Sequence, residues 1–149
     1  MKSVLKNTLI VLVGVVAGSF VNMTIVNVGP FVIPLPEGAD VSTMEGVRES
    51  MKLFTPVNFI CPLLAHALGT LVGAFVAARL SSDHPFGCAM GVSLFFLAGG
   101  IAAVSMIGGP VWFIVSDLVL AYLPMGWLAA ILAGEGRLAR QNTGPPDTP

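Results

Sequence analysis

Four long apolar stretches constrain this sequence more than any other feature. They cover residues 8–28, 56–80, 86–107 and 111–134, with boundaries set to within a few residues. A helix needs roughly 20 apolar residues to cross a hydrocarbon core about 30 Å thick, because each residue rises about 1.5 Å. We therefore predict an all-α integral membrane protein with four transmembrane helices, built as one domain over residues 1–134.

The overall composition agrees with this fold class. Hydrophobic residues make up 55% of the chain and charged residues 10%, whereas a soluble domain carries about 25% charged residues. The formal net charge is -1, which leaves no basic surface to neutralise phosphates. The lipid bilayer is thus the expected partner, and nucleic-acid binding is excluded.

The basic residues outside the spans predict the orientation of the chain. An excess of Lys and Arg marks the cytoplasmic side of a membrane protein. With the N-terminus inside, five basic residues lie in the cytoplasm and two outside; these are Lys2, Lys6, Arg79, Arg137 and Arg140 against Arg48 and Lys52. Both termini are therefore predicted to be cytoplasmic. The first apolar stretch exceeds the 7–15 residues of a signal peptide core, which favours an uncleaved helix.

The segment between the first two spans contains the signals of a short surface helix. Ser42-Thr43-Met44-Glu45 has the capping-box pattern that starts a helix. The apolar residues that follow recur every three or four positions, so we predict an amphipathic helix over residues 43–54. Two interpretations are open: an interfacial helix on the outer leaflet, or a lid that holds Asp40, Glu45 or Glu49 over a cavity mouth. Residues 135–149, rich in Pro, Gly and Thr towards their end, are predicted to form a flexible cytoplasmic tail.

Small residues recur at four-residue intervals within the apolar stretches. This spacing lets membrane helices approach backbone to backbone. The pattern predicts close helix contacts, within one chain or between copies, at Gly14, Gly18, Gly69, Gly73, Gly87 and Gly91.

One acidic residue, Asp117, lies inside a predicted span. It follows Val111 by six positions, so it lies roughly 9 Å below the outer boundary, where an ionised carboxylate costs several kcal/mol unless it is paired or hydrated. His66 lies about 15 Å deep by the same count, which allows a direct or water-mediated contact. The pair is a hypothesis for a proton or ligand site, because imidazole titrates near neutral pH. The alternative is a hydrogen bond between helices that fixes their register.

Further polar groups occur near this depth. Asn22 and Asn27 lie in the first span, and Asn58 and Thr70 are in line with His66 at multiples of four residues. We add these four to the candidate site. Tyr122 is a further polar group on the fourth span, and Pro124 frees the carbonyl of Leu120. No metal-ligand spacing occurs, and the sequence leaves the identity of any cofactor open.

Three segments resemble short bacterial inner-membrane proteins of unknown function. They are Pro34-Leu35-Pro36-Glu37-Gly38-Ala39-Asp40, the stretch 65–74 (AHALGTLVGA), and residues 117–127, which end in Pro124-Met125-Gly126-Trp127. The resemblance covers nearly everything but the tail. It implies a bacterial inner membrane and supports the choice of His66 and Asp117, but it implies no activity.

Three classes of function are compatible with these features. The first is proton-linked transport of an ion or small solute by a homo-oligomer, with Asp117 and His66 as the site. The second is a non-catalytic accessory subunit that uses the same groups as contacts between helices and binds other membrane subunits. A membrane-embedded enzyme is disfavoured, because the sequence has no nucleophile elbow and no paired catalytic motif.

Overall fold

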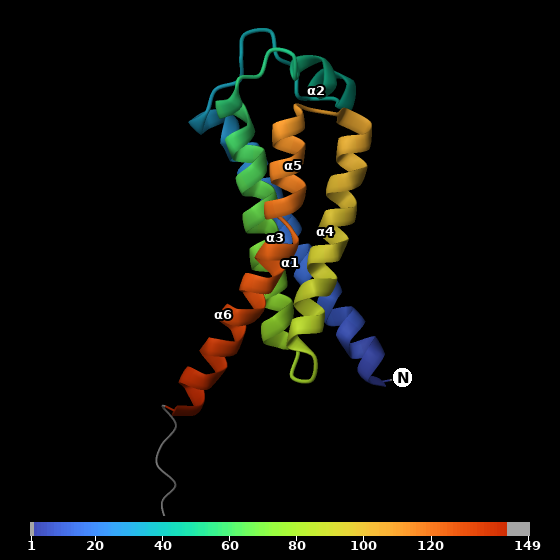
Figure 1. The fold of residues 1–149 in the computed structure, drawn as a ribbon, viewed down its shortest axis with the longest axis vertical. Helices are drawn as coiled ribbons and strands as arrows, with labels where there is room; N and C mark the ends of the chain where they lie inside the picture. Colours follow the sequence, from blue (N-terminus) through green and yellow to red (C-terminus); the bar gives the residue numbers. More distant parts are fainter. Residues whose placement is uncertain (1, 143–149) are drawn as a thin grey trace, which may run out of the picture.

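The computed structural model describes the backbone of residues 2–142 and the side chains of residues 3–134. All regular elements in this part of the chain are helical (Figure 1). They are α1 (Lys2–Val32), α2 (Met44–Ser50), the short 3-10 helix η1 (Pro56–Phe59), α3 (Ile60–Leu80), α4 (Pro85–Ile107), α5 (Val111–Leu120) and α6 (Leu123–Asn142). Four helical stretches of the described residues are long and apolar enough to cross a membrane: Ser3–Val32, Pro56–Leu80, Pro85–Ile107 and Val111–Gly134. The predicted fold class is confirmed.

The first and last helices are longer than the predicted spans. Helix α1 begins at Lys2 and continues through Pro30 to Val32, since a proline so near the end removes few backbone bonds. Helix α6 continues past Gly134 to Asn142, because the sequence offers no proline before Pro145 to stop it. The first part of the predicted flexible tail is therefore helical. Residues 143–149 of that tail lie outside the described residues.

Helix α2 is shorter than the predicted 43–54. Its N-cap is Thr43, whose hydroxyl accepts a hydrogen bond of 3.0 Å from the Gly46 N–H. The helix ends at Ser50, which is buried. The Ser50 hydroxyl accepts from the Asp40 N–H at 2.8 Å and donates to the Asp40 carbonyl at 3.0 Å. These two bonds fasten the end of α2 to the loop before it, and irregular turns follow.

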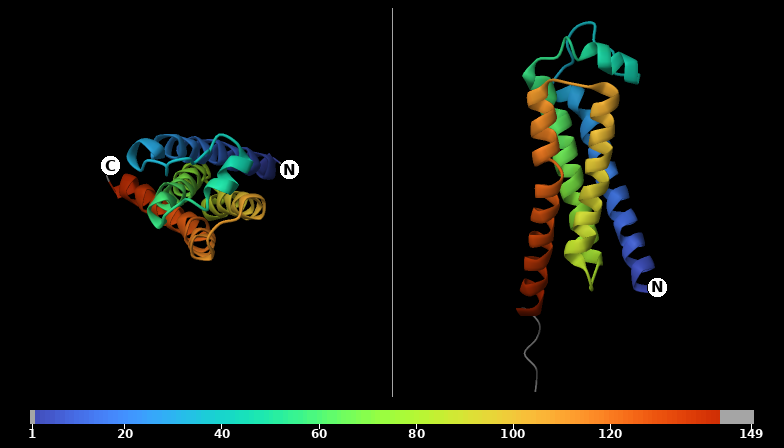
Figure 2. Two further views of the ribbon diagram at one scale, coloured as in Figure 1. Left: turned by 90° about the horizontal axis from the view of Figure 1, so that it is seen from above. Right: turned by 45° about the vertical axis from the view of Figure 1, so that its right-hand side comes forward.

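The helices pack most tightly in the half of the bundle next to the α3–α4 loop. The core there consists mainly of small residues from four helices: Ile10, Ala74, Ala77, Ala78, Cys88, Ala89, Val92, Ala129 and Ala133. Alanine side chains allow close helix approach without a hydrophobic driving force. Helices α1 and α6 diverge at the end that carries the α3–α4 loop (Figure 2). The candidate site lies on the other side of this core, towards α2.

Helix α1 crosses α3 at a point where two pairs of glycines meet. A Cβ added at Gly73 would lie 2.5 Å from the Gly14 carbonyl oxygen, and one added at Gly18 would lie 2.5 Å from the Gly69 carbonyl oxygen. Neither position has room for a side chain. The two helices therefore touch backbone to backbone, within a single chain.

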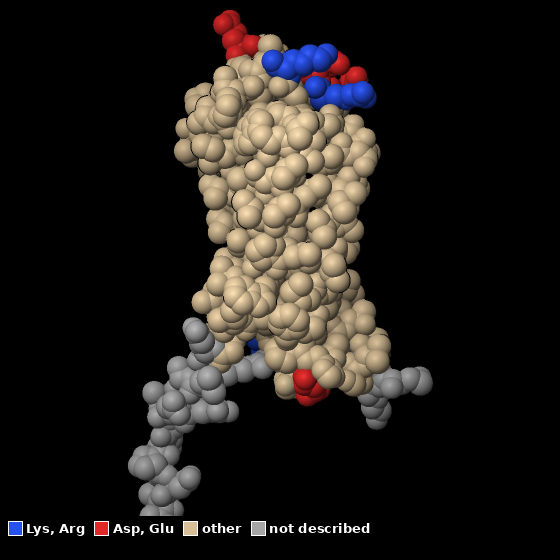
Figure 3. Space-filling view, viewed as in Figure 1, with Lys and Arg blue, Asp and Glu red and all other residues tan. Residues whose placement is uncertain are grey.

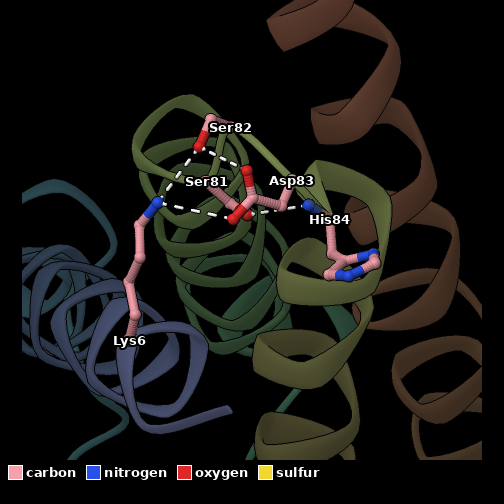
Figure 4. Close-up of polar contacts among 5 residues, drawn as sticks. All are labelled: Lys6, Ser81, Ser82, Asp83 and His84. Carbon is pink, nitrogen blue, oxygen red and sulfur yellow. Dashed lines mark hydrogen bonds and ion pairs between the residues drawn. The ribbon is translucent and has the colours of Figure 1, made fainter. Parts of the chain in front are cut away.

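Polar contacts lie at one end of the bundle, and a glycine turn lies at the other. At one end, the Lys6 ammonium bonds the Ser82 hydroxyl at 3.1 Å and lies 3.6 Å from the Asp83 carboxylate (Figure 4). The hydrogen bond from Ser82 and the nearby Lys6 charge lower the pKa of Asp83. At the other end, Gly108 and Gly109 adopt φ values of 81° and 145°, which glycine allows, and join α4 to α5. On the face seen in Figure 3, charged side chains gather at these two ends.

Candidate functional site

The fourth span is broken next to Asp117. Helix α5 ends at Leu120 and α6 begins at Leu123, although the sequence predicted one continuous helix over 111–134. Pro124 has no N–H to bond the Leu120 carbonyl, and its ring disfavours a straight helix. The break places Asp117 and Tyr122, five residues apart, on the same interior side of the span.

Asp117, His66 and Tyr122 form one hydrogen-bonded cluster. The Asp117 Oδ1 atom lies 2.8 Å from His66 Nδ1, and the Tyr122 hydroxyl donates to Asp117 Oδ2 at 2.9 Å. The Asp117 side chain is only 3% exposed. Each carboxylate oxygen thus has a hydrogen-bond partner, one from α3 and one from the break in the fourth span itself, which offsets the cost of burying the acid.

The contacts of Asp117 limit the roles that the two ring nitrogens of His66 can take. An ionised carboxylate can only accept hydrogen bonds, and Tyr122 already donates to one of its oxygens. A single proton is therefore shared between Asp117 Oδ1 and His66 Nδ1. The second nitrogen, Nε2, has no protein partner among the described residues, and the His66 side chain is 28% exposed. It is free to exchange a proton or bind a ligand.

His66 faces a cavity of about 200 Å³ between α1, α3, α4 and the broken fourth span. The polar part of its wall is formed by Ser19, Asn22, His66 and Tyr122, and the apolar part by Met23, Phe96, Gly99, Gly100 and Ala103. Within the described residues, neither Ser19 nor Asn22 makes a side-chain hydrogen bond. The cavity therefore presents unpaired polar groups at membrane depth, next to the imidazole.

Gly100 determines the position of Tyr122. A Cβ at Gly100 would overlap the Tyr122 hydroxyl and lie 2.7 Å from its Cζ atom. Tyr122 is only 2% exposed, so the ring has little space into which it could move. Glycine at this position allows the hydroxyl to reach Asp117.

The structure brings some of the predicted site residues together and separates others. Asn22 lines the cavity. The Thr70 hydroxyl donates to the His66 carbonyl of its own helix at 2.7 Å, so it contacts the backbone of His66 and does not line the cavity. Asn27 instead donates to the Met23 carbonyl of its own helix at 2.7 Å. Asn58 accepts from the Thr55 N–H at 2.9 Å and caps η1, so it takes no part in the site.

The acidic residues of the outer segment lie away from the His66 cavity. Asp40 accepts hydrogen bonds from the Ser42 hydroxyl and N–H, which lower its pKa. Glu49 binds Lys52 at 2.7 Å, and this contact lowers the pKa of Glu49. Glu45 is exposed on α2. None of the three lines the cavity, and α2 lies against the end of α4 (Figure 1).

The predicted packing glycines also divide into two groups. Gly14, Gly18, Gly69 and Gly73 form the α1–α3 crossing described above, and a Cβ at Gly91 would lie 3.2 Å from Val11. Gly87 is different, since a Cβ there would meet only the His84 side chain, at 3.8 Å. Gly87 makes no close helix contact.

Two members of the site were not recognised from the sequence as such. Ser19 resembles any other small residue near the α1–α3 crossing. Tyr122 was noted only as a further polar group, although its five-residue distance from Asp117, with Pro124 just after it, was an available signal. Among the described residues, no group of three or more His, Cys, Asp or Glu side chains could hold a metal ion.

Comparison with known proteins assigns no family to the chain. No family model matches the chain, and no curated protein and no solved structure matches it either.

Proposed function

We propose that this small integral membrane protein links the movement of an ion or small solute to the uptake and release of a proton by the Asp117–His66 pair. The observation that carries the proposal is the 2.8 Å contact between Asp117 Oδ1 and His66 Nδ1, in a His66 side chain that also lines a cavity. Intramembrane acids are costly and are typical of proton and ion pathways.

The chemistry of the pair supports proton exchange. When the carboxylate is ionised, His66 Nδ1–H donates to it and Nε2 can accept a further proton from the cavity. The resulting imidazolium lies against the Asp117 carboxylate, so uptake of the proton neutralises a buried negative charge. Tyr122 keeps its bond to Oδ2 in both states and holds the carboxylate in place.

The broken fourth span supports a transport role as well. Discontinuous helices near the midplane are common at the binding sites of membrane carriers, because the unwound backbone offers groups that a continuous helix keeps occupied. Here the break lies between Leu120 and Leu123, immediately beside the cluster. We further propose that both termini lie in the cytoplasm of a bacterial cell, with the membrane being the inner membrane.

Four short spans offer little room for alternating access, so we propose that the active form is a homo-oligomer. An accessory subunit in a larger membrane complex would need helix faces free for docking, and the predicted packing glycines are candidates for such faces. Four of those glycines, Gly14, Gly18, Gly69 and Gly73, are occupied within the chain by the α1–α3 crossing. This observation favours the transport proposal over the accessory one.

Proton entry into proteoliposomes tests the proposal. Vesicles containing a trapped pH-sensitive dye receive a K⁺ diffusion potential through valinomycin, first without a sodium gradient and then with one. We expect wild-type vesicles to acidify at least tenfold faster than Asp117→Asn vesicles in one of the two conditions. Equal rates for wild type and Asp117→Asn in both conditions would remove the proposed role.

Ser116→Ala is the matched control. Ser116 neighbours Asp117 on α5, but its hydroxyl bonds the Trp112 carbonyl of its own helix at 2.8 Å and is exposed. We expect this variant to conduct like the wild type. His66→Gln retains a polar side chain without a titrating group, and we expect it to behave like Asp117→Asn. Monodisperse elution of each variant in detergent separates loss of function from loss of fold.

A further inference from the structure

The position of the cavity restricts how a ligand can reach it. Every lining residue lies within one of the membrane spans, and none comes from the described loops at either end of the bundle. The lining residues with the most open surface lie on α1 and α4: Met23 is 56% exposed and Gly99 is also exposed. At this depth these surfaces face hydrocarbon. A ligand therefore meets the cavity from the bilayer side, between α1 and α4.

The charges around the cavity restrict the ligand further. Its wall contains no Lys, Arg, Asp or Glu, and the Asp117 carboxylate is covered by His66 and Tyr122. A permanently charged ligand would find no direct counter-charge in a medium of low dielectric. The unpaired groups are a hydroxyl, an amide and the imidazole Nε2. They suit an uncharged oxygen atom that donates or accepts a hydrogen bond.

The size of the cavity and the aromatic side chains of its wall favour a ring compound. A cavity of about 150 Å³ can hold a benzene molecule, and the space here is about 200 Å³. The His66 and Tyr122 rings lie nearly parallel, with centroids 5.9 Å apart and planes at 28°, and Phe96 adds a third ring to the wall. Gly99 and Gly100 contribute no side chains.

We propose that this cavity binds a lipid-soluble ring compound bearing an oxygen substituent, either a phenolic hydroxyl or a quinone carbonyl, which hydrogen-bonds to His66 Nε2. The inference rests on the proposed function, since it names the class of solute for the same site. Neutral His66 accepts a hydrogen bond from a hydroxyl, and protonated His66 donates one to a carbonyl. The protonation state of the pair therefore selects between the two oxygen groups. Binding alone is proposed, without electron transfer.

Gly99 provides a test variant that leaves the Asp117 cluster untouched. A Cβ at Gly99 meets no other atom within 4 Å, so Gly99→Leu adds a bulky side chain at the open side of the cavity, where a ligand would enter, without displacing a neighbour. Gly134 on α6 also has nothing within 4 Å and does not line the cavity. Gly134→Leu is thus a control that adds the same side chain elsewhere.

The binding experiment uses the full-length protein, immobilised from detergent micelles, with a decyl-substituted benzoquinone, its reduced quinol form and dodecanol as probes. The retained probe is extracted and quantified. We expect the wild type and Gly134→Leu to bind one of the two ring probes at one equivalent, and Gly99→Leu to bind it at least tenfold more weakly. Absence of binding by the wild type overturns the proposal, as does unchanged binding by Gly99→Leu. Equal retention of dodecanol overturns the requirement for a ring.

The two proposals fail separately. Ring-probe binding is measured at equilibrium without a gradient, whereas proton entry is measured without a ring probe. A wild type that binds the probe while its proton entry equals that of Asp117→Asn contradicts the proton role. A wild type that conducts protons without binding either ring probe contradicts the ligand class alone.

Discussion

Replacement of Gly100 by alanine tests whether the position of Tyr122 depends on a missing methyl group. The new Cβ would overlap the Tyr122 hydroxyl and lie 2.7 Å from Cζ, whereas ordinary contacts begin near 3.4 Å. The Cζ atom must therefore retreat by at least about 0.7 Å, the difference between these distances, and the hydroxyl by more. Because Tyr122 is only 2% exposed, that retreat forces neighbouring side chains to move and weakens the bond to Asp117.

The expected loss of stability follows from three effects. Overfilling a packed interior costs about 1–3 kcal/mol, and a weakened hydrogen bond between membrane helices costs about 1 kcal/mol more. Replacement of a helical glycine by alanine stabilises the helix by about 1 kcal/mol, which opposes these two costs. We expect Gly100→Ala to lower the free energy of unfolding by about 1–3 kcal/mol net. SDS titration in mixed micelles, followed by circular dichroism, measures this quantity.

The neighbouring glycine supplies the control. Gly99→Ala adds the same methyl group to the same helix with nothing within 4 Å, so its stability should equal or exceed that of the wild type by up to about 1 kcal/mol. On a Tyr122→Phe background, the cost of Gly100→Ala should fall, because the hydroxyl is gone and the ring no longer has to reach Asp117. Equal stability of Gly100→Ala and Gly99→Ala would refute the reasoning, and so would additive costs in the double variant.

Two further predictions concern the bundle and its outer segment. Gly73→Ala brings a Cβ to 2.5 Å from a backbone oxygen on α1 and should lower the free energy of unfolding by about 2 kcal/mol or more in the same titration. Gly87→Ala, with open space around it, should leave this free energy unchanged. Equal free energies of unfolding for the two variants would argue against the close α1–α3 crossing. The hydrogen bonds from Ser42 lower the pKa of Asp40 below its ordinary 3.8, so the stability that they give to the start of α2 is present above that pH and is lost as the pH falls through the lower value. The protection of the Ser42 amide against hydrogen exchange, measured by NMR relative to the intrinsic rate at each pH, should fall in that range in the wild type, while Asp40→Asn should show no such loss of protection.

The spans could be predicted because their signal is strong and local. Hydropathy and length alone located Pro56–Leu80 and Pro85–Ile107 to within a residue of the observed ends. Helix ends beyond the hydrocarbon core were less predictable, since polar helix formers such as those after Gly134 continue a helix without changing its apolar signal. The break after Leu120 could be predicted only in part. Pro124 indicated a freed carbonyl, but a proline in a membrane span can also be accommodated by a gentle kink.

The sequence predicted the chemical type of the candidate site better than the full set of residues that form it. A lone acid at membrane depth identified Asp117, and counted depth allowed contact with His66. The four-residue series that added Asn58 assumed that one α-helix begins at Pro56. The chain starts there with a 3-10 turn, whose cap uses the Asn58 side chain. To identify Tyr122 as a site residue, one needs to know that the fourth span breaks after Leu120. To identify Ser19, one needs the direction in which α1 crosses α3.

The order of the elements along the chain has a consequence for how Asp117 enters the membrane during synthesis. An aspartate at the centre of a span opposes insertion by about 2.5–3.5 kcal/mol. Helix α3, which carries His66, precedes α5 in the chain, so the principal partner of the acid has already been made when α5 emerges. Tyr122 follows Asp117 by only five residues. The nascent fourth span thus meets one ready partner for its carboxylate and brings the second with it.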